Sequence, residues 1–356
     1  YYQQFQEEVF TVPTGASFGR FWGPIASELA GVRRVFYVPD GIFHRINPAL
    51  LYAAAPDYFL LEKVAVTFAA SLAAVTNPDL PGKDIIRALL VGNPDYGPPG
   101  THRWAALPKT QNEVIAARKH LQNNGATATL LTAKAATPRQ VQDQIPGQQL
   151  LHLATHAYFR PYAAVIGQLA TAVPTATAGS YPSALNYLRD EQGRRTVADQ
   201  TTYQNWLQKT DLTTYLSADS LTAYQQKLDA KAGIVLAGAN ASPRDGYLLR
   251  SDLARLDLAA AQMVILSACD VGRGDLNERT ELGGFAQDFR AHGVRYLISS
   301  LWPVQDRAGG AFITAFYRAW LTDNLPPEQA FVAAQRELLE AGEPLYYWGG
   351  FTLTKL

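Results

Sequence analysis

Two side chains are candidates for nucleophilic chemistry, Cys269 and His156. Cys269 is the single cysteine of the chain, and it follows an apolar run in the stretch MVILSACDVGRGD. His156 follows a second apolar run, in LLHLATHA. A cysteine attacks as its thiolate, and a neighbouring imidazole is a common means of producing that thiolate. The two residues therefore predict a Cys–His dyad, provided that the fold brings the two runs side by side.

Each of the two residues also has a purely structural interpretation. Free cysteines are among the most buried residue types, so Cys269 taken alone is better explained as an inert core residue. His156 taken alone is more often a structural histidine whose ring is satisfied by hydrogen bonds. What favours catalysis is that both residues come at the end of an apolar, strand-like run. The glycines Gly272 and Gly274 after the cysteine would also let the backbone turn and present N–H groups to an oxyanion.

Strand-like and helix-like segments alternate along most of the chain, which predicts the layers that must position this pair. Strands are predicted within 33–41, 62–71, 85–100, 126–138, 150–156, 232–238, 262–269 and 294–302, and helices within 107–125, 281–293, 306–323 and 326–342. Continuously apolar strands that alternate with helices are typical of an α/β sandwich, a mostly parallel sheet with helices on both faces. Chemistry in such sheets lies at the carboxyl ends of the strands, where both candidate residues fall.

The chain divides by composition into a smaller N-terminal subdomain, 1–82, and a larger domain, 83–356. The turn-rich joint PDLPGKD separates them. Within the larger domain, a segment at about 160–228 is rich in Ala, Thr, Gln and Tyr and contains the charged sequence RDEQGRR. We interpret it as an insertion with some helix of its own. It is either a tolerated decoration or a regulatory segment cleaved at its basic residues.

Composition excludes several classes of protein. Basic and acidic residues number 31 each, so charge predicts neither a nucleic-acid-binding surface nor a membrane-binding one. One cysteine rules out an internal disulfide and argues against a cysteine zinc site. No apolar run approaches the ~20 residues of a membrane helix, and the N-terminus lacks the pattern of a signal peptide. We therefore expect a cytoplasmic protein without a cofactor. The absence of an initiating Met suggests a part of a longer product.

Several stretches resemble one known family. They are HLATHA, GIVLAG, DGYLLRSDLARLDLAAAQMVILSACDVGRGD, GGFAQDFRAHGVRYLISSLWPVQD and QAFVAAQRELLEAGEPLYYWGGFTL, together with VFYVPDGIFHRINPALL near the N-terminus. They look like the CHAT family, caspase-like cysteine peptidases that are related to separases and often joined to tetratricopeptide repeats. The resemblance covers nearly the whole chain except the insertion. It implies a caspase-like three-layer α/β/α sandwich with a smaller N-terminal pseudo-protease subdomain.

The resemblance also implies roles for residues. His156 would be the general base and acid, and Cys269 the nucleophile of an endopeptidase. The oxyanion donors would be the N–H groups of Cys269 and of Ala157. Members of the family usually have glycine after the histidine, but an alanine N–H also donates unless its backbone needs a positive φ. The expected partners are a protein substrate and a regulatory repeat domain or effector, in prokaryotic stress signalling or anti-phage defence.

The substrate pocket is less sharply predicted. Asp270 and Asp275 lie in the cysteine loop, where they are either pocket acids or solvated loop residues. Asp306 follows SLWPVQ and would hold a basic residue of the substrate, but it also lies where the N-cap of the next helix is expected. Trp302 would form a pocket wall or pack in the core.

Three alternatives remain at this stage. The first is an inactive caspase-like scaffold that docks protein partners, which Ala157 and the insertion favour. The second is a hydrolase based on Ser267 or Ser299, although no nucleophile-elbow motif surrounds either serine. The third is a metal pair of His152 and His156, which would share one face of a strand but have no carboxylate to complete the site.

Overall fold

The computed structural model describes residues 2–11, 13–76, 80, 84–98, 104–159, 188–189, 195–196, 232–241, 245–267, 285–302 and 304–356. Cys269, Asp270 and Asp275 lie outside these residues, as do the helices expected within the insertion. Of the insertion, two short strands are described, β9 (Leu188–Arg189) and β10 (Arg195–Thr196), which pair antiparallel.

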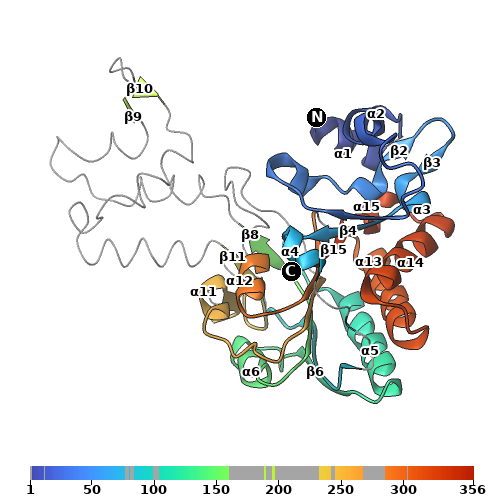
Figure 1. Ribbon diagram of the computed structural model, residues 1–356. Coiled ribbons are helices and arrows are strands. Elements are labelled where there is room, and N and C mark those ends of the chain that lie inside the picture. The colour runs from blue at the N-terminus through green and yellow to red at the C-terminus, as the bar shows by residue number, and fades with distance from the viewer. Residues whose placement is uncertain are drawn as a thin grey trace.

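An eight-stranded sheet forms the centre of the molecule (Figure 1), with the strand order β1-β4-β15-β14-β13-β7-β5-β6. Its strands are β1 (Arg34–Tyr37), β4 (Ala65–Ala69), β5 (Arg87–Pro94), β6 (Thr127–Ala133), β7 (Leu150–Ala154), β13 (Met263–Ser267), β14 (Tyr296–Ser300) and β15 (Phe351–Lys355). Every neighbouring pair is parallel except β14 and β15, which are antiparallel. The mostly parallel α/β sheet predicted from the sequence is thereby confirmed.

Helices cover both faces of this sheet (Figure 1). One face carries α5 (Pro108–Asn123), α13 (Asp306–Tyr317) and α14 (Pro327–Glu340), and the other carries α6 (Pro138–Gln144), α11 (Arg250–Leu253) and α12 (Phe285–Ala291). Alternation along β7 serves both layers: Leu150 and Ala154 join one buried cluster, while Leu151 and Leu153 join the other. A strand that is buried on both faces needs the continuous apolar run seen in its sequence.

The remaining elements are short. The helices are α1 (Tyr2–Phe10), α2 (Ala16–Phe21), α3 (Leu60–Lys63), α4 (Leu72–Val75) and α15 (Leu345–Trp348), with 3-10 turns at Gly23–Ile25, Gly41–Arg45 and Pro48–Leu50 and a π-helical turn at Arg318–Thr322. The strands are β2 (Tyr52–Ala53) and β3 (Tyr58–Phe59), which form a hairpin, and β8 (Ala157–Phe159), β11 (Ala232–Val235) and β12 (Tyr247–Leu249), which form a three-stranded sheet.

The N-terminal part shares the central sheet with the rest of the chain. The last strand, β15, lies between β14 and β4, so it joins β1 and β4 to the strands that follow residue 83. One apolar cluster likewise contains Phe5 and Trp22 together with Phe312 and Phe351. Sheet and core thus cross the expected boundary at 82/83, although the division into 1–82 and 83–356 stays a prediction.

Helix ends follow the residue types that predict them. α5 begins with Pro108 at its first position, and α14 begins with Pro327 in the same place, where a missing N–H costs no hydrogen bond. Gly125 and Gly342, just beyond the two helices, have φ of 87° and 70°. This left-handed conformation is the usual stop for a helix and is easiest for glycine. The predicted helices at 107–125 and 326–342 are confirmed.

Candidate functional site

His156 lies two residues beyond the carboxyl end of β7, and β7 pairs in parallel with β13. The register sets Ser267, the last residue of β13, opposite Ala154, the last residue of β7. Cys269 follows Ser267 in the sequence by the same two positions by which His156 follows Ala154. The adjacency of the two strands, on which the predicted dyad depends, is therefore confirmed. The position of Cys269 itself lies outside the described residues.

The ring of His156 is oriented by a backbone carbonyl. Its Nε2 lies 2.8 Å from the carbonyl oxygen of Ala105. Because a carbonyl oxygen only accepts, Nε2 must carry the hydrogen and donate it. In a neutral imidazole the lone pair that takes up a proton is then on Nδ1. The His156 ring is also flanked by two aromatic rings, with centroid distances of 5.1 Å to Trp104 and 5.3 Å to Tyr96.

The main chain around His156 is held by a connected set of hydrogen bonds. The carbonyl of His156 accepts from the N–H of Val235 at 2.8 Å. The Thr155 hydroxyl donates to the carbonyl of Val235 at 2.5 Å, so it accepts from the Tyr96 hydroxyl, 2.8 Å away. Thr155 is 1% exposed. Buried hydroxyls that both donate and accept leave few alternative arrangements, so this network favours one position for His156.

Ala157, the predicted oxyanion donor, begins β8 and pairs with Ile234 of β11. It is not among the non-glycine residues with positive φ, and its pairing is that of ordinary extended backbone. A glycine is therefore not required here for conformational reasons. The alanine at this position does not by itself argue for an inactive scaffold.

His152 belongs to a separate, fully buried cluster. Its Nε2 lies 2.8 Å from Oε1 of Glu113 on α5, and its Nδ1 lies 3.2 Å from the hydroxyl of Tyr317 on α13. Burial, and then the nearby Glu113 carboxylate, raise the pKa of Tyr317 well above its ordinary value of 10.0. The hydroxyl therefore stays protonated and donates to Nδ1, while Nε2–H donates to Glu113. The cluster ties β7 to two helices of one layer, α5 and α13.

The expectation that His152 and His156 share a strand face with no carboxylate nearby is wrong. β7 ends at Ala154, so His156 is no longer on the strand, and Glu113 is the carboxylate bound to His152. The two rings have different partners, because His152 faces the helices whereas His156 contacts Ala105. Across the described ranges, no group of three or more His, Cys, Asp or Glu side chains is placed to hold a metal ion.

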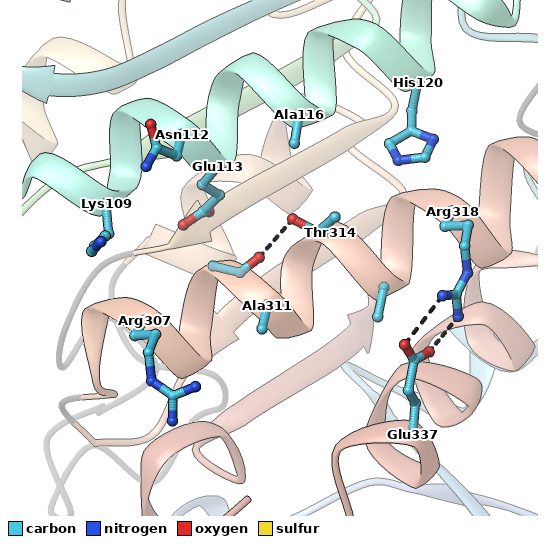
Figure 2. A pocket seen from close by; sticks show the side chains of 12 residues that line it. Lys109, Asn112, Glu113, Ala116, His120, Arg307, Ala311, Thr314, Arg318 and Glu337 are labelled. Atoms are coloured by element: carbon cyan, nitrogen blue, oxygen red, sulfur yellow. Dashed lines mark hydrogen bonds and ion pairs between the residues drawn. The ribbon is translucent and has the colours of Figure 1, made fainter. Parts of the chain in front are cut away.

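A groove of about 470 Å³ lies between α5 and α13, and Glu113 is the member of the buried cluster that lines it (Figure 2). Figure 2 shows Glu113 pointing from α5 toward α13, with the ion pair of Arg318 and Glu337 at one end of the groove. His120 also lines it. Burial, followed by the charges of Lys119 and Arg318, lowers the pKa of His120. The lowered pKa favours the uncharged form of the His120 imidazole.

The predicted pocket residues are placed as follows. Trp302 is 2% exposed, its Nε1 donates to the carbonyl of Tyr346 at 2.9 Å, and its ring meets Phe10 edge-on at 5.8 Å. These contacts favour the core-packing alternative for Trp302. Asp306 is not the N-cap of the following helix: Gln305 holds that position, and Asp306 is the first residue of α13.

The serine alternatives can also be located. Ser267 ends β13 and Ser299 lies within β14, and both are buried, at 9% and 4% exposed. The carbonyl of Ser299 accepts from the hydroxyl of Thr352 on the neighbouring strand. Among the described residues, no hydrogen bond joins either serine to a histidine, so neither forms the nucleophile–base pair that a serine hydrolase requires.

The sequence did not point to the residues that contact the His156 ring, namely Tyr96, Trp104 and Ala105. Trp104 follows a turn-rich loop and carries the one available signal, a lone aromatic residue outside any predicted strand or helix. Ala105 acts through its backbone carbonyl, which every residue has, so its residue type carries no signal at all.

Within the part of the chain that the structure describes, no helix has both the length and the apolar character needed to cross a bilayer.

Comparison with known proteins places the chain in a family. The CHAT domain model matches residues 16–355. The crystal structure of the Arg-specific cysteine proteinase gingipain R is similar at a TM-score of 0.50, with 10% identity, over 98% of this chain and 69% of that one. The complex of Porphyromonas gingivalis RgpB pro- and mature domains gives a TM-score of 0.46, with 9% identity, over 94% of this chain and 66% of that one. No curated protein sequence gives a significant match.

At such low identity, the likeness to gingipain R bears on the fold alone. It agrees with the expected caspase-like arrangement, a large and mostly parallel sheet flanked by helices. The family model covers both the N-terminal part and the segments of the sequence that contain His156 and Cys269, so the resemblance found in the motifs extends over nearly the whole chain. The chain belongs to the CHAT domain family.

Proposed function

We propose that this protein is a cysteine endopeptidase in which Cys269 is the nucleophile and His156 the general base and acid. The observation that carries the proposal is the pairing of β7 with β13, which gives the two residues equal offsets from paired strand ends. Membership in the CHAT family and the caspase-like fold support it. So does the orientation of His156, whose Nε2 donates to Ala105.

The reaction follows from these roles. Nδ1 of His156 takes the proton of the Cys269 thiol, and the sulfur attacks the scissile carbonyl carbon while the C=O π electrons move to oxygen. The tetrahedral intermediate collapses, the C–N bond breaks, and the imidazolium protonates the leaving amine. Water then gives a proton to His156 and attacks the thioester carbon. The C–S bond breaks to release the acid product, and His156 returns its proton to the sulfur.

The oxyanion of each tetrahedral intermediate needs donors that are already in place. We assign these to the backbone N–H groups of Cys269 and Ala157. Ala157 is paired with Ile234 in the small sheet, which fixes its backbone and so limits reorganisation during the reaction. Loss of one such donor typically costs ~10²–10³ in kcat.

Substrate recognition is proposed to involve an extended peptide with a basic residue before the cut. Asp270, Asp275 and Asp306 are the candidate acids, and Trp302 would support them from the core. Gingipain R, whose fold is similar, is an Arg-specific cysteine proteinase. An acidic pocket in this chain would select for the same charge, because a carboxylate pairs with guanidinium in a bidentate manner.

The biological setting is proposed from the family. The protein would act in the cytoplasm of a prokaryote, in stress or anti-phage defence signalling. A repeat region or an effector protein would control it, and a protein substrate would be its target. The insertion at about 160–228 separates the two catalytic strands in sequence, so it is a natural place for such control.

An active-site probe tests the catalytic proposal. The protein, together with its Cys269→Ala, His156→Ala and Ser267→Ala variants, is treated with peptidyl acyloxymethyl ketones that carry Arg, Lys, Asp or Leu at P1. We expect labelling of the wild type and of Ser267→Ala, with Arg or Lys preferred. Neither Cys269→Ala nor His156→Ala should be labelled at a comparable rate, because one lacks the thiol and the other lacks its base.

Peptide-library cleavage by the same four proteins provides the second readout. Cleavage that depends on both Cys269 and His156 supports the endopeptidase. Cleavage that survives Cys269→Ala but not Ser267→Ala would instead support the serine alternative. If none of the four proteins is labelled or cleaves a peptide, and the folded wild type still binds a protein partner, the inactive scaffold is the correct function.

A further inference from the structure

The backbone that orients His156 is itself held by one buried side chain, Asn240. Asn240 lies in the turn between β11 and β12 and is 4% exposed. Its Oδ1 accepts from the backbone N–H of Trp104 at 2.8 Å, and its Nδ2 donates to the carbonyl of the same residue at 3.0 Å. The side-chain amide therefore pairs with both polar groups of Trp104, as a strand partner would.

We call these two hydrogen bonds between the Asn240 side chain and Trp104 the clamp. The clamp lies one residue from the backbone carbonyl that accepts from His156. Trp104 is followed directly by Ala105, whose carbonyl accepts from Nε2 of His156 at 2.8 Å. Planar peptide bonds leave few soft torsions between two adjacent carbonyls. A side chain that fixes both the N–H and the C=O of Trp104 thus restricts where the Ala105 carbonyl can point.

Further hydrogen bonds hold both Asn240 and Trp104 in place, which makes the clamp rigid. The backbone N–H of Asn240 donates to the carbonyl of Tyr96 at 2.8 Å, and Nδ2 also donates to Gly97 at 3.2 Å. The indole of Trp104 donates to the hydroxyl of Tyr247 at 2.9 Å, and that hydroxyl donates to the carbonyl of Ala239 at 3.2 Å. Side chain and main chain of Trp104 are thereby both tied to the same turn.

From this geometry we propose that Asn240 is a positioning residue for catalysis: by clamping Trp104, it holds the Ala105 carbonyl that keeps the hydrogen of His156 on Nε2 and leaves Nδ1 as the base. The inference rests on the proposed cysteine peptidase function for its kinetic consequence. Its structural content, the tautomer and orientation of His156, does not depend on activity. Without the clamp, the carbonyl can move and either ring nitrogen of His156 can carry the hydrogen.

Asn47 provides a matched control for a general loss of stability. It is 2% exposed and also bridges backbone groups, because its Oδ1 accepts from Ala49 and its Nδ2 donates to Gly349. It lies in the N-terminal part, away from the Trp104–Ala105 segment in sequence and in its hydrogen bonds. An Asn47→Ala variant therefore removes a comparable buried amide without touching that segment.

The test combines ring ¹⁵N NMR of histidine with kinetics on the full chain. Spectra are recorded in the Cys269→Ala background, and the His156 signals are assigned from a His156→Gln sample. We expect the Nε2–H tautomer of His156 in the parent and in Asn47→Ala, and a mixture of tautomers in Asn240→Ala. With Cys269 intact, kcat of Asn240→Ala should fall ~10–100-fold, the range for a displaced catalytic group, while KM changes little and Asn47→Ala keeps its kcat.

A second variant covers the case in which Asn240→Ala does not fold. Asn240→Asp keeps the shape and the acceptor for Trp104 N–H, but it turns a carboxylate oxygen instead of an amide toward the Trp104 carbonyl, which repels it. The same change of tautomer is expected. An unchanged His156 spectrum in whichever of the two variants folds overturns the proposal. If the His156 spectrum changes in the folded Asn240 variant while the wild-type protein cleaves nothing, the clamp is supported and the peptidase is refuted.

Discussion

Nε2 of His152 lies 2.8 Å from Oε1 of Glu113, and both side chains are shut off from solvent, at 0% and 1% exposed. This contact joins β7, the strand that leads to His156, to the helix α5 on its face. The hydroxyl of Tyr317 adds a third member from α13. Removal of the partner of such a buried carboxylate destabilises the folded protein, because desolvation of an unpaired charge is costly.

Replacement of His152 by leucine should therefore destabilise the protein strongly. His152→Leu leaves Glu113 buried without its donor, and we expect a loss of about 3–5 kcal/mol in the free energy of unfolding. Tyr317→Phe removes one neutral hydrogen bond and should cost only about 1 kcal/mol. Urea unfolding of the two variants measures both values. The double variant His152→Leu/Glu113→Leu should lose less than the sum of its single variants, and strict additivity would contradict the pairing.

The sequence predicted some of these relationships and could not predict others. Apolar runs at 150–156 and 263–269 were sufficient to predict two buried parallel strands, because burial on both faces requires such runs. The partner of His152 could not be read in the same way, since Glu113 lies on a helix 39 residues away and looks like one of many helical acids. Only the packing of α5 on β7 selects it.

Two features of the candidate site could not be predicted correctly from the sequence. The Ala105 carbonyl is backbone, so no residue type marks it, and Asn240 resembles any turn asparagine until the turn is placed against Trp104. The N-cap expected at Asp306 was off by one residue, because helix starts are set by local backbone torsions that sequence patterns locate only to within a residue or two.

Gly92 marks a close approach of α5 to the sheet and should not tolerate a larger residue. A Cβ at this position of β5 would lie 2.6 Å from Cγ2 of Val114 and 2.7 Å from the carbonyl of Thr110. Gly92→Ala must push α5 away, and we expect a loss of about 1–3 kcal/mol in thermal or urea unfolding. Gly19, in α2, has no heavy atom within 4 Å of the point that a Cβ would occupy. Gly19→Ala should therefore be neutral or stabilise the protein by up to about 1 kcal/mol.

The buried ion pair of Lys355 and Glu328 should matter for the strand that joins the two parts of the chain. Nζ of Lys355 on β15 lies 3.4 Å from Oε1 of Glu328, which also accepts from the hydroxyl of Tyr296 at 2.8 Å. Lys355→Met removes one charge and leaves the other buried, so a loss of about 3–5 kcal/mol is expected. Lys119 is exposed on α5, and Lys119→Met should change stability by less than about 0.5 kcal/mol. Equal effects of the two variants would rule out a buried pair.

Acid should weaken the contact of α1 with α2 through Glu8. Burial raises the pKa of Glu8, but hydrogen bonds from Thr14, Ser17 and Ala16 outweigh it, so the pKa lies below the ordinary value of 4.5. A carboxyl with a lowered pKa in the folded state stabilises above its unfolded pKa, and this stabilisation is lost as pH falls through the folded value. The difference in free energy of unfolding between wild type and Glu8→Gln should thus be largest near pH 7 and shrink below about pH 4.5. The exposed Glu7 provides the control, and a pH-independent difference for Glu8→Gln would contradict the ionised carboxylate.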